Sequence, residues 1–304
     1  MNVLITGGTG FIGKQLIQLL LKEGHSVTNL STQRNQERVI SEHFQHVYWN
    51  PTTKEINKAL LPDIQGVIHL AGFSVANKWT TANKALMVSS RISSTEFLCE
   101  LLNEMNSKPS VFVGASASGY YKNSAEVQDE TAEKGTGFLS DLTQQWEEAC
   151  STLDSSIRKI HLRIGVVLSA NDGALKKLTP IFKAGIGSSV GEGKQYMSWV
   201  HERDLVELFS YCISNNVPSG VYNATSTNPV TNQEFSKTLA QVLHRPFFLP
   251  KTPAFFLKLI FGEMAQLVLV SQRLSNSKIT STGFKFRFNT IQEALTNVYG
   301  KAEN

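Results

Sequence analysis

The chain has 304 residues, of which 41% are hydrophobic and 18% are charged. This composition is typical of a globular protein with a sizeable core, and it excludes an intrinsically disordered chain. The formal net charge is only +4 and the basic residues are scattered, so we expect no nucleic-acid partner. The most apolar stretch, residues 255–270, is short for a membrane span and contains Lys258 and Glu263, which predicts a buried or partner-facing helix and no membrane association.

The cysteines and histidines suggest no special chemistry. Cys99, Cys150 and Cys212 form no Cys-x-x-Cys pair, so we expect three buried thiols in a reducing compartment. Metal-ligand spacing is absent, and no metal site is predicted. The first strand begins almost at residue 1 with no signal peptide ahead of it, which favours a cytoplasmic protein. The oligomeric state stays open, with a homodimer as one alternative.

The N-terminal 30 residues carry a pattern for binding phosphate. An apolar strand at residues 3–6 runs into Gly7-x-x-Gly10-x-x-Gly13, and a helical pattern and a second strand at residues 26–30 follow. Glycines permit a sharp turn, close approach of a diphosphate and tight packing of the helix, whose N-terminus offers free N–H groups. The expected cofactor contacts here are Gly7, Thr9, Gly10, Phe11, Ile12 and Gly13.

The end of the second strand indicates which dinucleotide is bound. An acidic residue at this place would bind the ribose 2′-hydroxyl of NAD. The segment reads "NLSTQRNQE", with Ser31 and Arg34 present and no acid before Glu37. A guanidinium pairs well with a 2′-phosphate, so the sequence favours NADP(H) over NAD(H). The alternative is that Arg34 is only a solvated loop charge.

The remaining elements alternate as in a doubly wound parallel sheet. Apolar strands are predicted at residues 66–72, 110–121, 159–169 and 219–226, with helices at residues 81–103, 138–153 and 204–214 between them. At the end of the first of these strands, Leu70, Ala71 and Gly72 would let the cofactor's ribose approach. The predicted fold is therefore α/β, a Rossmann-type sheet with helices on both faces.

A smaller C-terminal α/β unit is expected to bind substrate. A Gly/Ser-rich stretch at residues 185–199 is typical of a loop that lines a site. Thr231 and Glu234 form a capping box at the start of another helix. We assign residues 1–168 to the Rossmann domain, with residues 199–226 returning to it, and residues 169–198 and 227–304 to the smaller domain.

Several motifs together resemble the extended short-chain dehydrogenase/reductases. They are "TGGTGFIG", "HLAG", "ASASGYY", "LRIGVVLS", "SWVHERDL" and "TGFKFRF", and they span nearly the whole chain. More narrowly, the chain resembles the atypical subgroup named epimerase family proteins, which are similar to NAD-dependent epimerases and dehydratases. The resemblance implies a Rossmann domain, a dinucleotide cofactor and a C-terminal substrate domain.

The resemblance also implies a Tyr-x-x-x-Lys pair that this chain lacks. In the superfamily the tyrosine moves the proton that accompanies hydride transfer, and the lysine lowers the pKa of that tyrosine and holds the ribose. No tyrosine here is followed four residues later by lysine, and Phe138 and Leu142 stand at the expected place. Ser116 matches the superfamily serine, as a catalytic and cofactor-contacting residue or as a helix or turn cap. Tyr121 is the alternative proton donor.

Other residues matched by the resemblance leave two functions open. Trp199 and His201 match a segment on the substrate side, although His201 fits a structural role as well. Our first hypothesis is an NADP(H)-binding oxidoreductase or epimerase-like enzyme acting on an unassigned small molecule. The alternative is a non-catalytic NADP(H) sensor or interaction protein. The phosphate-binding glycines support both, because binding phosphate requires none of the missing residues.

Overall fold

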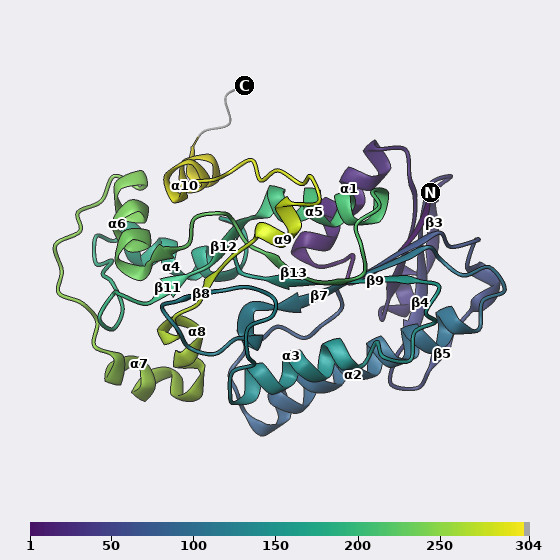
Figure 1. Ribbon diagram of the computed structural model, residues 1–304, viewed down its shortest axis with the longest axis horizontal. Helices are drawn as coiled ribbons and strands as arrows, with labels where there is room; N and C mark the ends of the chain where they lie inside the picture. Colours follow the sequence, from purple (N-terminus) through teal and green to yellow (C-terminus); the bar gives the residue numbers. More distant parts are fainter. Residues whose placement is uncertain (301–304) are drawn as a thin grey trace.

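The protein, described over residues 1–300 by a computed structural model, is built on a nine-stranded sheet (Figure 1). The strand order is β13-β9-β7-β6-β1-β2-β4-β3, with β5 paired to β4. All pairs are parallel except β3 with β4 and β5 with β4. The strands are β1 (Asn2–Thr6), β2 (Ser26–Ser31), β3 (Arg38–Ser41), β4 (Phe44–Asn50), β5 (Glu55–Ile56), β6 (Gly66–His69), β7 (Val111–Ala117), β9 (Arg158–Ile164) and β13 (Gly220–Ala224).

Helices cover both faces of this sheet, which confirms the predicted doubly wound α/β fold. The helices α1 (Phe11–Lys22) and α5 (Glu202–Ser214) pack on one face, where their apolar side chains join one buried cluster. The helices α2 (Thr81–Asn103) and α3 (Phe138–Glu148) lie on the opposite side in Figure 1, and the apolar side chains of α2 join a second cluster. All three cysteines are free and buried, as expected.

A third buried cluster lies away from the main sheet and includes Leu168, Phe182, Trp199, Phe235 and Leu295. The predicted capping box of Thr231 and Glu234 is present at the start of α6. The elements around this cluster and along the rest of the C-terminal part are α4 (Gly173–Lys183), β11 (Tyr196–Met197), β14 (Val230–Thr231), α6 (Asn232–Val242), α7 (Ala254–Phe261), α8 (Gln266–Leu269), β15 (Arg273–Leu274), α9 (Ser277–Thr280) and α10 (Ile291–Tyr299). The short strand β8 (Val127–Gln128), which precedes α3 in the chain, pairs with β15. Short 3₁₀ helices are η1 (Arg34–Gln36), η2 (Lys58–Leu60), η3 (Ser118–Tyr120) and η4 (Gly262–Ala265).

One expected strand is divided in two at Gly165. The sequence predicts a single strand over residues 159–169, but β9 ends at Ile164 and β10 (Val166–Leu168) leaves the sheet to pair with β12 (Trp199–His201). The reason is a close backbone approach, because a Cβ on Gly165 would lie 2.5 Å from the carbonyl oxygen of Ser198. The N–H of Val166 then donates to that same oxygen at 2.8 Å.

The apolar stretch at residues 255–270 forms α7, η4 and α8. Several of its side chains face solvent, among them Phe255 and Leu259, the latter 79% exposed. Over residues 1–300, no helix combines the length and the apolar character needed to cross a bilayer.

Candidate functional site

The three glycines of the Gly7-x-x-Gly10-x-x-Gly13 motif after β1 do not all serve the same purpose. Gly7 has φ +72°, and a Cβ there would lie 2.7 Å from the carbonyl carbon of Leu70. A Cβ on Gly13 would lie 2.3 Å from the oxygen of Gly7. Gly10 has ordinary backbone angles, and its Cβ would meet only the Gly7 oxygen, at 3.1 Å. Gly7 and Gly13 are thus required by packing, whereas Gly10 leaves space that the protein itself does not fill.

A buried asparagine holds this glycine loop in place. The Oδ1 atom of Asn29 on β2 accepts a hydrogen bond from the N–H of Gly8 at 3.1 Å. Its Nδ2 atom lies 2.8 Å from Nδ1 of His46 on β4. Sequence reasoning missed Asn29, although an amide side chain in the middle of the predicted strand 26–30 was an available signal.

A second buried network joins the ends of β1 and β6. The Thr6 hydroxyl lies 2.7 Å from Nδ1 of His69 and accepts a hydrogen bond from the N–H of Ala71 at 3.2 Å. The other ring nitrogen of His69 lies 2.9 Å from the Thr95 hydroxyl on α2. Burial lowers the pKa of His69 to about 3, so the ring is neutral at ordinary pH. The network fixes the Leu70–Gly72 turn beside Gly7.

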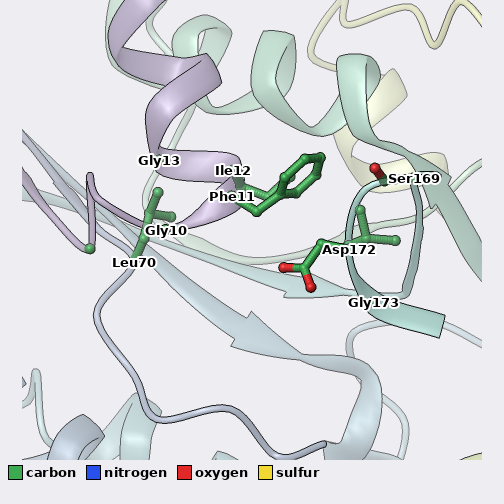
Figure 2. A pocket seen from close by; sticks show the side chains of 10 residues that line it. Gly10, Phe11, Ile12, Gly13, Leu70, Ser169, Asp172 and Gly173 are labelled. Atoms are coloured by element: carbon green, nitrogen blue, oxygen red, sulfur yellow. The ribbon is translucent and has the colours of Figure 1, made fainter. Parts of the chain in front are cut away.

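A cavity of about 280 Å³ opens beside the glycine loop (Figure 2). Six of the twelve expected cofactor contacts line it, namely Gly7, Gly10, Phe11, Ile12, Gly13 and Leu70. Thr9 and Ala71 are adjacent in sequence to lining residues, and Gly72 is one residue further on. The opposite wall comes from residues that sequence reasoning missed, at the end of β10 and the start of α4. The lining residues are Gly7, Gly10, Phe11, Ile12, Gly13, Leu70, Val167, Ser169, Asp172 and Gly173.

The N-terminus of α1 lines the cavity. Gly10 is the N-cap of this helix and supplies no side-chain hydrogen bond, and the first turn has no acidic residue. The first N–H groups of a helix and its positive dipole end attract anions. A side chain at position 10 would occupy the space in front of them. These features fit a diphosphate at this place.

Ser31 and Arg34 lie at the end of β2, outside the cavity lining. The Ser31 hydroxyl donates to Oε1 of Gln36 at 3.0 Å. The Arg34 side chain is exposed, pairs with Glu55 and lies over the ring of Tyr48. The pKa of Arg34 is raised, first by its hydrogen bond to the Glu55 carboxylate.

Phe138 and Leu142 occupy the first turns of α3 and offer no proton donor. Leu142 is buried, and the Phe138 ring packs edge-on against Trp79 with centroids 5.2 Å apart. An ammonium group nevertheless reaches Phe138 from another helix, because Nζ of Lys84 on α2 lies 5.1 Å from the ring centroid. Lys84 forms an ion pair with Glu263 of η4.

The hydroxyl of Ser116 is bound to a carboxylate. It donates to Oε1 of Glu147 on α3 at 2.5 Å. Glu147 also accepts two hydrogen bonds from the guanidinium of Arg163, both at 2.8 Å. Arg163 in turn lies over the Tyr120 ring, with Cζ 3.4 Å from the centroid. Ser116, Glu147 and Arg163 therefore form one connected polar group at the ends of β7 and β9.

Tyr121 is buried, and its hydroxyl donates to Oδ1 of Asn223 at 2.7 Å. Burial raises the pKa of Tyr121 to about 12. Neither Ser116 nor Tyr121 belongs to the cavity lining.

The residues assigned to the substrate side lie in the interior. The indole N–H of Trp199 donates to the carbonyl oxygen of Asn228 at 3.0 Å. His201 is the N-cap of α5, where its Nδ1 accepts a hydrogen bond from the N–H of Arg203 at 3.1 Å. Its ring stacks on Phe288, and burial lowers the pKa of His201 to about 4. Helix capping uses Nδ1 and core packing uses the ring face, while Nε2 is buried without a hydrogen-bond partner among residues 1–300.

An arginine on α2 lies behind the Leu70–Gly72 turn. A Cβ on Gly72 would lie 3.0 Å from Cζ of Arg91. Arg91 donates to the carbonyl oxygen of Phe73 at 2.8 Å and packs over the Trp146 ring. Burial lowers the pKa of Arg91 to about 10. Within residues 1–300 it has no carboxylate partner at ion-pair distance, and no cluster of His, Cys, Asp and Glu there is arranged to hold a metal ion.

Comparison with known proteins identifies the family. The NAD dependent epimerase/dehydratase family matches residues 3–225, and a domain of unknown function, DUF1731, matches residues 252–298. The epimerase family protein YfhF of Bacillus subtilis is 35% identical, over 98% of this chain and 98% of its own length. The chloroplastic epimerase family protein SDR39U1 homolog of Arabidopsis thaliana is 33% identical, over 97% of this chain and 86% of its own length.

A solved structure agrees with these relatives. The crystal structure of human epimerase family protein SDR39U1 (isoform 2) with NADPH superposes with a TM-score of 0.89 and 28% identity, over 98% of this chain and 99% of that one. The fold, the glycine loop and the sequence relatives lead to the same assignment. The chain belongs to the NAD dependent epimerase/dehydratase family and, within it, to the atypical extended short-chain dehydrogenase/reductases known as epimerase family proteins.

Proposed function

We propose that this protein binds NADP(H) in the cavity beside the glycine loop and acts as an oxidoreductase or epimerase-like enzyme on a small molecule. The observation that carries the proposal is the space in front of Gly10, at an uncapped helix N-terminus that a side chain would block. The human relative's structure with NADPH supports the same cofactor. Bound nicotinamide would supply hydride transfer.

Each end of the cofactor would meet a different part of the chain. The N–H groups at the start of α1 would bind the diphosphate. The Leu70–Gly72 turn would lie against a ribose, with the Arg91 cation behind it. Arg34 would pair with the 2′-phosphate, since the segment that follows β2 in sequence has no acidic residue before Glu37 to bind a free 2′-hydroxyl. The preference for NADP(H) over NAD(H) rests on this last contact.

Proton transfer would need a route other than the missing tyrosine. Of the two hydroxyls considered, the geometry favours Ser116 over Tyr121. Ser116 is buried like Tyr121, but its hydroxyl donates to a carboxylate, so its oxygen would accept a proton from a substrate alcohol while its own proton moves to Glu147. Tyr121 has a raised pKa and is fully engaged with Asn223.

The occupied hydroxyls also favour the second function, a cofactor sensor without catalysis. A sensor would need the glycine loop but no accessible proton donor. The experiment that separates the two is a screen of carbonyl and alcohol compounds for oxidation or reduction of the bound cofactor, after NADPH binding has been measured by calorimetry. Turnover that is lost in Ser116→Ala, with unchanged NADPH affinity, would support the enzyme. Tight NADPH binding without turnover across the screen would support the sensor.

A further inference from the structure

The guanidinium of Arg34 is already paired with a carboxylate of the chain itself. Its Nη2 atom lies 2.6 Å from Oε1 of Glu55. Its Cζ atom lies 4.1 Å above the centroid of the Tyr48 ring. The side chains of Arg34 and Glu55 are 68% and 48% exposed. A ligand arriving from solvent can therefore reach this pair.

The sheet itself brings the three side chains together. In the parallel pairing of β2 with β4, Tyr48 lies beside Ser31, the last residue of β2. The chain then turns back, and β5 pairs with β4 so that Glu55 lies opposite Asn50. Glu55 is thus returned to the end of β2 by strand pairing, and not by a loose surface loop.

A carboxylate and a phosphate monoester compete for the same guanidinium. Both are anions that accept parallel N–H···O bonds from its edge. The Tyr48 ring covers one face of the Arg34 group, and anions accept hydrogen bonds along the edges of a guanidinium. A phosphate bound there must either displace Glu55 from Arg34 or lie close to the negative charge of Glu55. Either alternative weakens phosphate binding.

We propose that Glu55 is an internal competitor for the 2′-phosphate and that it limits the selectivity of this protein for NADPH over NADH. Tyr48 is the platform that holds Arg34 in place for either anion. This inference rests on the proposed function, because it requires the 2′-phosphate to bind at Arg34. Glu55 would be a specificity-determining residue that makes no favourable contact with the cofactor.

The test is calorimetric titration of the full chain with NADPH and with NADH. Glu55→Gln should tighten NADPH binding roughly two- to fivefold, the range expected for an exposed ion pair, and leave NADH binding unchanged. The gain should shrink as salt is added, because the competing charges are exposed. Tyr48→Leu should weaken NADPH binding, whereas Tyr48→Phe should retain it.

A matched control is available on the same sheet edge. Glu37 accepts a hydrogen bond from the N–H of Tyr48 at 3.0 Å, through Oε2, instead of pairing with Arg34. Glu37→Gln removes the same charge from the same neighbourhood without breaking an ion pair of Arg34. It should therefore raise NADPH affinity less than Glu55→Gln does. Equal gains in both variants would mean a general charge effect and would overturn the competitor role.

Two failures can be told apart. If Arg34→Ala binds NADPH as well as the wild type does, the 2′-phosphate does not bind at Arg34 and the proposed NADPH preference is wrong. If Arg34→Ala weakens NADPH binding but Glu55→Gln leaves it unchanged or weaker, the competitor role alone is overturned. A weaker affinity would mean that Glu55 orients Arg34 for the cofactor, and an unchanged one that Glu55 plays no part in cofactor binding.

Discussion

Replacing Gly10 by valine should remove cofactor binding and leave the fold intact. The added Cβ meets only the Gly7 oxygen, at 3.1 Å, and the backbone angles of Gly10 suit any residue. Loss of glycine's freedom in the unfolded chain offsets this contact, so we expect the free energy of unfolding to change by less than about 1 kcal/mol. The valine methyl groups would occupy the space assigned to the diphosphate. NADPH affinity should fall by at least about 100-fold, which corresponds to roughly 2.7 kcal/mol.

Gly13→Ala is the matched comparison, because it adds a smaller group at a closed position. Its Cβ would lie 2.3 Å from the Gly7 oxygen and 2.6 Å from Cα of Gly8, so the backbone itself must move. We expect destabilisation of about 1–3 kcal/mol, as for other overpacked sites. Urea unfolding and calorimetric titration of both variants separate the two effects. A folded Gly10→Val that binds NADPH normally, or a Gly13→Ala as stable as the wild type, would refute this account of the loop.

The other predictions concern the remaining contacts. Arg34→Ala should weaken NADPH binding roughly 10- to 100-fold and spare NADH, as expected for a lost charge-assisted pair; equal losses for both would contradict the assignment. Once a substrate is known, Ser116→Ala should lower turnover 100-fold or more while Tyr121→Phe lowers it little, and the reverse result would move the proton route to Tyr121. His69 is neutral in the folded protein, where its pKa is lowered from 6.5 to about 3. Its contribution to the free energy of unfolding should therefore be fully present above pH 6.5 and be lost as the pH drops towards 3. Urea midpoints of His69→Gln should show a flatter pH dependence, and an unchanged slope would exclude His69 as its source.

The phosphate-binding part of the site could be predicted because its signal is local. Gly7, Gly10 and Gly13 lie within seven residues, and each requirement is a property of one short turn and its helix. The doubly wound sheet was predictable for a similar reason, since alternating strands and helices of this length admit few topologies. The departure of β10 from the main sheet at Gly165 was not predictable. It depends on the close approach of Ser198, which is distant in sequence.

The polar network at the end of β7 shows a second limit of sequence reasoning. Ser116, Glu147 and Arg163 come from three separate elements, and only the assembled sheet places them within hydrogen-bond distance. From sequence alone, a charged residue such as Glu147 is predicted to lie on the solvent-exposed face of an amphipathic helix. His201 matched a substrate-side segment and fitted a structural role as well, and the fold shows that its ring caps α5 and stacks on Phe288.

The division of one strand at Gly165 has a consequence for how the cavity opens. From β9 to the far wall of the cavity the chain passes through Gly165, β10 and a bend over residues 170–172, so a hinge next to the sheet would lie at Gly165. That position is clamped, because Ser198 approaches it closely and accepts the Val166 hydrogen bond. We therefore expect this wall to stay fixed while ligands enter and leave.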